Sequence, residues 1–122
     1  MTEKLRIGVM TSGGDAPGMN AAVRAVVKSA IKGGADVYGI YNGYVGLQHP
    51  ENGGVKELTV GEVSGIINLG GTILGTARCD AMLKPEGRRK AISTLVHYGI
   101  DRLICIGGDG SLTGAENLRR EW

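Results

Sequence analysis

The chain has 122 residues and a formal net charge of +2, and its apolar runs are far shorter than the ~18 residues of a membrane-spanning helix. So small a charge gives no reason to expect nucleic acid as a partner. Cys79 and Cys105 lie far apart without a CxxC motif, which predicts free thiols in a reducing compartment. We therefore expect a cytoplasmic, single-domain protein that binds neither nucleic acid nor membrane.

The first part of the chain predicts a strand, a glycine turn and a helix. Residues 5–10 form an apolar run that ends in the glycine-rich turn 11–18. One face of the following helix carries Val23, Val26, Val27, Ala30 and Ile31. Asp15 and Pro17 suit the start of this helix, and Gly33 suits its end.

The middle of the chain has weaker periodicity. We expect a strand over 36–41, an irregular surface loop over the Gly-, Asn- and Pro-rich stretch 42–54, and a short strand over 55–58. Thr59 and Glu62 have the spacing of a capping box for a helix. The predicted inner face of this helix consists of Val63, Ile66 and Ile67. We expect it to end near residues 70–71, before a loop over 72–84.

The last part of the chain repeats the opening pattern. Pro85 begins a helix that Gly99 ends. The predicted inner face of this helix consists of Ile92, Leu95 and Val96. A buried strand over 103–106 then ends in the turn 107–111, and a second helix follows. Its apolar face consists of Leu112, Ala115, Leu118 and Trp122.

This alternation predicts an α/β fold, a Rossmann-like three-layer sandwich with a mostly parallel sheet. Right-handed crossovers place every turn from a strand into a helix at one edge of such a sheet, the carboxyl edge. The glycine turns at 13–14 and 107–111 are therefore expected on the same side, although almost a hundred residues separate them. A ligand would bind across them.

The turn at 107–111 has the character of an anion site. A glycine turn at a helix start presents clustered backbone N–H groups, and the helix dipole adds positive potential. Asp109 would repel a phosphate there unless a divalent cation lay between them, so the sequence predicts phosphate together with Mg²⁺. The alternative is that Asp109 is only a helix N-cap, although Ser111 is close enough to take that role.

Neither turn matches the two commonest phosphate motifs. Residues 11–20 lack the lysine of a GxxxxGK[ST] loop, and the first turn does not fit GxGxxG. A domain that binds NAD or a flavin stays open as an alternative, because Asp36 lies about 20 positions beyond the first turn. His49 and His97 have no partners at metal-ligand spacing.

Three segments of the sequence are similar to motifs of a known protein family. They are TSGGDAPGMNAAVR at 11–24, GGTILGTAR at 70–78 and IGGDGSLTGA at 106–115. In this order and spacing they resemble consecutive motifs of the 6-phosphofructokinase family. The resemblance implies a glycolytic kinase that transfers the γ-phosphoryl group of ATP to fructose 6-phosphate with Mg²⁺, giving fructose 1,6-bisphosphate.

The resemblance also implies roles for particular residues. The backbone at Gly14 would approach the ATP phosphates, and Arg78 would stabilise charge on the transferred phosphoryl group with Cys79 beside it. The loop along the nucleotide phosphates would consist of Gly108, Asp109, Gly110 and Ser111, with Asp109 as the carboxylate for Mg²⁺. Related pyrophosphate-dependent enzymes often carry aspartate in place of Gly110, so glycine favours ATP, with pyrophosphate as the alternative donor.

The effector site departs from the bacterial pattern. Arg24 and Lys28, on one helix face, fall where bacterial members bind a nucleotide effector with two arginines. Lysine keeps the charge but loses the bidentate fork. Val60 and Gly65 stand where bacterial members have further effector contacts, which argues against allostery of the bacterial kind.

The resemblance assigns residues 1–122 to the N-terminal part of an ATP-binding lobe. The family motif with the aspartate base for the sugar hydroxyl would follow Trp122, so we expect this part alone to bind nucleotide without phosphorylating the sugar. A non-catalytic nucleotide-binding module is the alternative function. We expect the parent protein to be a homo-oligomer, a tetramer by resemblance. An exposed sheet edge and apolar face should make residues 1–122 self-associate.

Overall fold

The computed structural model describes residues 4–12, 18–77 and 79–122. The elements in chain order are β1 (Arg6–Thr11), α1 (Met19–Lys32), β2 (Asp36–Ile40), α2 (Tyr44–Gln48), η1 (Pro50–Asn52), β3 (Val55–Leu58), α3 (Val60–Val63), η2 (Asp80–Leu83), α4 (Pro85–His97), β4 (Arg102–Ile106) and α5 (Asp109–Glu121), where η marks a 3₁₀ helix. The predicted strands all form, with bounds that differ by one residue at some ends.

The described strands form one sheet in the order β3-β2-β1-β4. β1 pairs in parallel with both β2 and β4, whereas β3 pairs with β2 in antiparallel orientation. A five-residue helix such as α2 rises only about 7.5 Å, less than half the length of a strand of equal residue count. α2 is therefore too short to carry the chain back to the amino end of β2. β3 starts instead beside the carboxyl end of β2 and runs antiparallel to it. The sheet is mostly parallel, as the sequence predicts.

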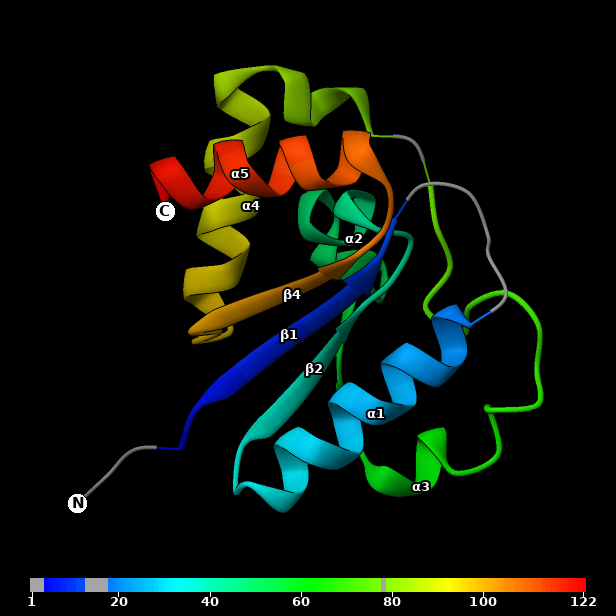
Figure 1. The fold of residues 1–122 in the computed structure, drawn as a ribbon. Coiled ribbons are helices and arrows are strands. Elements are labelled where there is room, and N and C mark those ends of the chain that lie inside the picture. Colours follow the sequence, from blue (N-terminus) through cyan, green and yellow to red (C-terminus); the bar gives the residue numbers. More distant parts are fainter. Residues whose placement is uncertain (1–3, 13–17, 78) are drawn as a thin grey trace.

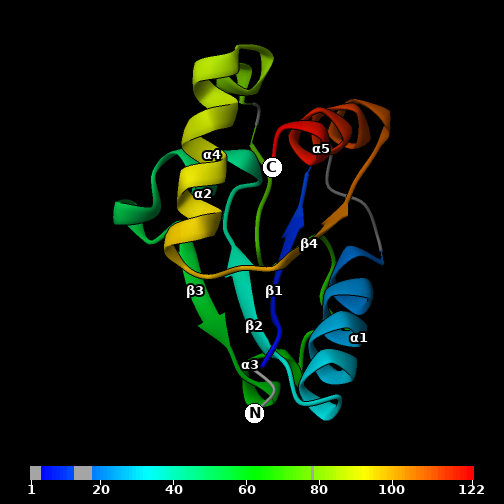
Figure 2. The same cartoon turned by 90° about the vertical axis from the view of Figure 1, so that its left-hand side faces the viewer.

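Helices cover both faces of the sheet (Figures 1 and 2). Successive strand residues point to opposite faces, so Val9 and Met10 belong to different cores. On the side of α1 and α3, the buried core consists of Val9, Val23, Val27, Val37, Leu58, Val63, Ile66 and Leu74. On the side of α2, α4 and α5 it consists of Met10, Ile40, Tyr44, Leu47, Val55, Met82, Ala91, Leu95, Ile100 and Leu118. The predicted three-layer sandwich is confirmed.

The start of α1 differs from the prediction. The helix begins at Met19, and its N-cap is Gly18 with a φ of 96° in the left-handed region, where glycine is favoured. Asp15 and Pro17, the expected start residues, lie outside the described residues. Gly33 is the C-cap, as predicted.

The region 42–54 is not the irregular loop that its composition predicts. It contains α2 and η1, and α2 buries Tyr44 and Leu47. Glycine at 46 is a requirement of this packing, because a Cβ there would clash with the carbonyl oxygens of Tyr41 and Gly54. Gly46 and Gly54, which contribute to the loop-like composition, therefore allow close packing of backbone against backbone.

The predicted helix after Thr59 is much shorter than expected. Its capping box is present, with Thr59 Oγ1 accepting from Glu62 N at 3.4 Å and Glu62 Oε1 accepting from Thr59 N at 3.2 Å. The helix nevertheless ends at Val63. Ile66 is buried but lies beyond the helix, and Ile67 is 53% exposed, contrary to prediction. Glycines at 61 and 65 weaken the helical conformation here.

The helix that begins at Pro85 forms as predicted, with Ala91 and Leu95 buried. Val96, predicted to point inward, is 65% exposed. The buried face of α4 consists of Ala91, Thr94 and Leu95, and Val96 lies about 100° further around the axis from Leu95, on the side away from Ala91 and Thr94. The expected loop over 72–84 also contains the short η2.

The apolar face of α5 is only partly covered. Leu118 is buried, whereas Leu112 and Trp122 are 51% and 40% exposed, contrary to the prediction of one buried face. β4 is the edge strand of the described sheet, so no further strand lies beneath this side of the helix.

Candidate functional site

The carboxyl ends of β1 and β4 lie side by side. Thr11 is opposite Ile106 in the parallel register, and the backbone N–H of Ser12 donates to the Ile106 carbonyl oxygen at 2.9 Å. Ser12 directly precedes the first glycine turn, and Ile106 directly precedes the second. β1 and β4 thus end at the same edge of the sheet, as the sequence predicts (Figure 1), while residues 13–17 of the first turn lie outside the described residues.

The start of α5 presents backbone N–H groups at this edge. The helix begins at Asp109, and the capping position falls on Gly108, whose backbone is extended. The reading of Asp109 as the N-cap is therefore wrong, since it is the first helical residue. The first N–H groups of a helix have no partner within it. A Cβ at Gly108 would meet no atom within 4 Å, so there is open space beside this turn.

The loop that carries the second motif is joined to the same edge. The buried Thr11 hydroxyl lies 2.8 Å from the Thr72 hydroxyl and donates to the Gly75 carbonyl oxygen at 2.9 Å. The Asn42 backbone N–H, just after β2, donates to the Leu74 carbonyl oxygen at 2.7 Å. All three sequence motifs therefore meet where the parallel strands end.

Asn20 lies inside the first motif and has no role assigned to it in the sequence-based prediction. Its side chain is 2% exposed, its Oδ1 accepts from Ile73 N at 2.7 Å, and its Nδ2 donates to the Leu69 carbonyl oxygen at 3.1 Å. This amide fixes the loop before Leu74 against the start of α1. Its position inside the first motif is the only sequence signal for this role.

Tyr44 and Gly114 lie near the same edge, and the sequence predicts no role for either of them. The Tyr44 hydroxyl lies 3.9 Å from Cys105 Sγ, and a Cβ at Gly114 would lie 3.3 Å from the Tyr44 ring. Burial raises the pKa of both the Tyr44 phenol and the Cys105 thiol above their usual values. Both groups are therefore uncharged at neutral pH. Cys79 packs against the same core, and both cysteines are free thiols.

Some of the predicted site residues lie outside the described residues, and others lie on a different part of the fold. Gly14 and Arg78 lie outside the described residues, and Asp109, Gly110 and Ser111 are placed in the first turn of α5. Arg24 and Lys28 lie on α1, across the sheet from α5. Within the described part of the chain, Arg24 Nε is buried without a hydrogen-bond partner.

Asp36, the acidic residue on which the alternative of a NAD- or flavin-binding domain depends, does not lie where it could contact a ribose at the ligand-binding edge. It is the first residue of β2, opposite Arg6, and its carboxylate lies 3.4 Å from Lys4 Nζ. That is the amino edge of the sheet, whereas ligands of such folds bind at the carboxyl edge. Across residues 4–12, 18–77 and 79–122 there is also no group of three or more His, Cys, Asp or Glu side chains placed to hold a metal, and no helix long and apolar enough to span a membrane.

The fold and this edge define an α/β domain of the class that binds its ligands at the carboxyl ends of parallel strands. Residues 6–122 match the phosphofructokinase family. The chain belongs to that family.

Individual relatives agree with this assignment. The chain is 55% identical over 113 residues to an ATP-dependent 6-phosphofructokinase of Halalkalibacterium halodurans, covering 93% of this chain and 34% of that protein. It is 52% identical to the alpha subunit of the Saccharomyces cerevisiae enzyme, covering 98% of this chain and 12% of that protein. The chain thus spans about a third or less of these relatives.

Solved structures are similar as well. Pichia pastoris phosphofructokinase in the T-state has a TM-score of 0.93 at 50% identity, covering 100% of this chain and 13% of that one. A pyrophosphate-dependent phosphofructokinase from Marinobacter aquaeolei has a TM-score of 0.82 at 20% identity, covering 96% of this chain and 29% of that one. At that identity the second likeness concerns the fold alone.

Proposed function

We propose that this chain is the N-terminal part of the ATP-binding lobe of a 6-phosphofructokinase, and that the parent enzyme transfers the γ-phosphoryl group of ATP to fructose 6-phosphate. The observation that carries the proposal is the adjacency of Ser12 and Ile106, the residues that directly precede the two glycine turns in the sequence. Relatives that are 52–58% identical and named ATP-dependent support ATP as the donor.

The start of α5 is the proposed phosphate and metal site. Backbone N–H groups at Gly108, Gly110 and Ser111 would bind the phosphates, and the open space beside Gly108 suits a bulky anion. Asp109 offers carboxylate oxygens, the ligands that Mg²⁺ prefers. When bound, Mg²⁺ supplies positive charge that neutralises the phosphate oxygens.

The remaining family residues complete the proposed site. The Gly14 backbone would lie along the phosphates, and the Arg78 guanidinium would stabilise negative charge on the transferred group. Cys79 would lie beside the nucleotide. Arg24 and Lys28 are proposed effector contacts, on the other side of the sheet from α5. We also propose that the parent is a cytoplasmic homo-oligomer, a tetramer, which light scattering of the longer protein would test.

Calorimetry of residues 1–122 tests the metal and nucleotide site. We expect Mg-ATP to bind and EDTA to weaken binding, because the metal separates the phosphates from Asp109. Asp109→Asn should remove most of this metal dependence and weaken Mg-ATP binding by at least about tenfold, the scale of one charged contact. Asp80→Asn is the matched control, because Asp80 lies in η2 and has no assigned metal role.

Two outcomes would contradict the proposal. If ATP bound equally well with and without EDTA, Asp109 would have no metal role. If inorganic pyrophosphate bound and ATP did not, the donor would be wrong. Residues 1–122 lack the family motif with the aspartate base, so we expect no sugar phosphorylation from them and full turnover from the longer parent. Measurable turnover by residues 1–122 would place the base within this chain.

A further inference from the structure

The segment η2 immediately follows Cys79 and is pressed against the start of α4. Cys79 is the N-cap residue of η2, and its carbonyl oxygen accepts from the Met82 backbone N–H at 3.4 Å, so the Cys79 backbone is joined to η2. Gly87, in the first turns of α4, permits the contact, because a Cβ there would clash with the Ala81 carbonyl oxygen. Met82 is 5% exposed, beneath this contact.

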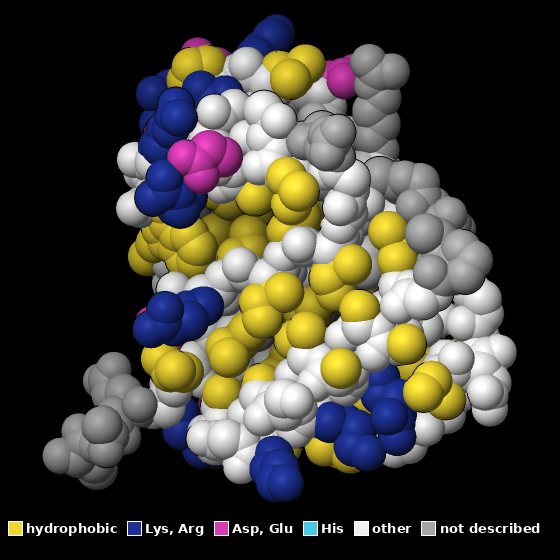
Figure 3. All heavy atoms as spheres, viewed as in Figure 1, with side chains coloured by type: hydrophobic (Ala, Val, Ile, Leu, Met, Phe, Trp, Pro, Cys, Tyr) yellow, Lys and Arg dark blue, Asp and Glu magenta, His cyan; other side chains and the backbone are white. Residues whose placement is uncertain are grey.

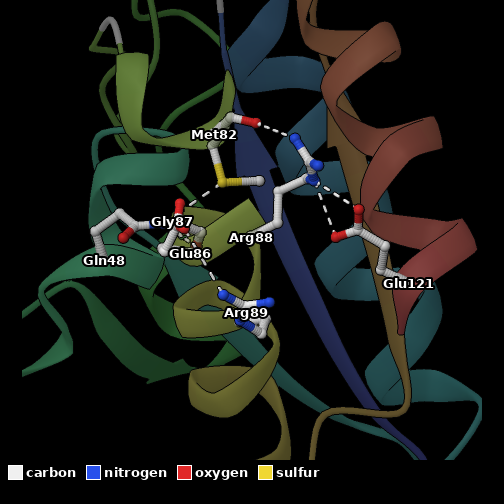
Figure 4. A network of polar contacts seen from close by, with 7 residues as sticks. All are labelled: Gln48, Met82, Glu86, Gly87, Arg88, Arg89 and Glu121. Carbon is white, nitrogen blue, oxygen red and sulfur yellow. Dashed lines mark hydrogen bonds and ion pairs between the residues drawn. The ribbon is translucent and has the colours of Figure 1, made fainter. Parts of the chain in front are cut away.

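A buried amide fastens η2 and α4 to α2. Gln48 Nε2 donates to the Gly87 carbonyl oxygen at 2.7 Å and lies 3.5 Å from Met82 Sδ (Figure 4). Gln48 is 5% exposed, so this amide has exchanged water for these two partners. One side of η2 is thus fixed from the core.

Arg88 fastens the other side of η2 to α5. Its Nη1 donates to the Met82 carbonyl oxygen at 3.1 Å, and its Nε lies 2.8 and 2.9 Å from the two carboxylate oxygens of Glu121 (Figure 4). The Arg88 side chain is 14% exposed. Because a guanidinium is rigid and planar, its hydrogen bonds to Met82 and to Glu121 fix η2 and α5 relative to each other.

The two segments that Arg88 joins both lead to the candidate site. η2 follows Arg78 and Cys79, and α5 begins at Asp109. We propose that Arg88 is a positioning residue, which holds the Cys79 segment at a set distance from α5 without touching the nucleotide itself. An effect of Arg88 on nucleotide affinity rests on the proposed function. An effect of Arg88 on the position of Cys79 is independent of that function.

The neighbouring arginine shows what an ordinary surface pair looks like. Arg89 is 70% exposed and lies 3.9 Å from Glu86, with no bond to η2 among the described contacts. Exposed pairs of this kind contribute little. Arg89→Gln is therefore the matched control for Arg88→Gln, with the same chemical change one position along the same helix.

The rate at which Cys79 reacts with a thiol reagent tests the proposal. Peptide mass spectrometry after brief alkylation reports Cys79 and Cys105 separately, without ATP and with Mg-ATP. We expect Arg88→Gln and Glu121→Gln to speed alkylation of Cys79 by about tenfold, the scale of losing a charged hydrogen bond that holds a segment closed. Cys105 should be unaffected. The same variants should bind Mg-ATP several-fold more weakly, and Arg89→Gln should match the unaltered chain.

Each failure has a distinct meaning. Unchanged Cys79 alkylation in Arg88→Gln would overturn the positioning role, and equal acceleration at Cys105 would show general loosening and overturn it too. If Arg88→Gln does not fold by circular dichroism, Glu121→Gln decides by the same rates. If the unaltered chain does not bind Mg-ATP, the proposed function fails, while the alkylation rates without ATP still decide the role of Arg88.

Discussion

Asn20 shows how one amide can organise a motif loop. Its oxygen and nitrogen bind the Ile73 N–H and the Leu69 carbonyl across 53 and 49 positions of sequence. Both partners lie in a stretch without regular secondary structure, so no ladder or helix satisfies them. Removing the amide leaves these partly buried backbone groups without their partner.

We expect Asn20→Ala to lower the free energy of unfolding by about 1–3 kcal/mol, the cost of leaving a buried polar group unpaired. Urea denaturation of the variant and of the unaltered chain would measure it. Asn52→Ala, at the exposed end of η1, should change the free energy by less than about 0.5 kcal/mol. Equal effects of the two substitutions would show that the Asn20 contacts contribute no stability.

Contacts of this kind could not be predicted from the sequence. The Thr11 and Thr72 hydroxyls lie 61 positions apart, and no periodic pattern links them. By contrast, the ending of β1 and β4 at the same edge of the sheet could be predicted, because it follows from their parallel orientation. The geometry around Arg78 stays a prediction.

At the scale of helices and strands, the sequence predicts best those elements that have a clear start or stop residue or a continuous apolar run. Pro85 and the left-handed Gly99 bound α4 as expected, and apolar runs mark β1 and β4. The elements that the sequence mispredicts are the glycine-rich ones. In α2, Gly46 serves close packing rather than a turn, and α3 ends after a single helical turn despite its capping box.

The end of α5 carries a group whose titration can be tested. Arg119, by hydrogen bonding, and then Arg120 hold the pKa of the Glu116 carboxyl at about 2, below its usual 4.5. Because the folded pKa is the lower one, this interaction stabilises the helix above about pH 4.5 and is lost as the pH falls towards 2.

NMR titration of the Glu116 carboxyl carbon should therefore show a midpoint near pH 2. In Arg119→Gln the midpoint should move back towards 4.5, since the largest cause is removed. Arg89→Gln, on α4, should leave the midpoint unchanged. A midpoint near 4.5 in the unaltered chain would contradict the hydrogen bond from Arg119.

At the scale of the whole molecule, one side is left apolar. A hollow of about 750 Å³ lies between β4 and α5, lined in part by Ile104, Leu112 and Trp122. These side chains are 37%, 51% and 40% exposed. Figure 3 shows apolar side chains gathered on this side, bordered by basic groups. A contiguous apolar patch of this kind favours association.

We expect residues 1–122 to self-associate through this face. Leu112→Lys should raise the dissociation constant by at least about tenfold, because a side chain of this size contributes some 1.5–3 kcal/mol when buried. Sedimentation equilibrium would measure it. Leu83→Lys is the control, since Leu83 is 77% exposed but lies in η2, outside the hollow. A monomer at all concentrations, or an equal effect of both variants, would contradict this prediction.

The order of the strands has a consequence for synthesis on the ribosome. β1 lies between β2 and β4, and its pairing with β4 joins positions about 95 residues apart. The ribosome synthesises about 5–20 residues per second, so β4 is completed some 5–20 s after β1. Until then, the edge of β1 that pairs with β4 has no partner strand. During that interval the face of β1 that carries Met10 also lacks its late partners Ala91, Leu95 and Leu118, so the nascent chain exposes an apolar side chain beside an unpaired strand edge, a combination that favours aggregation.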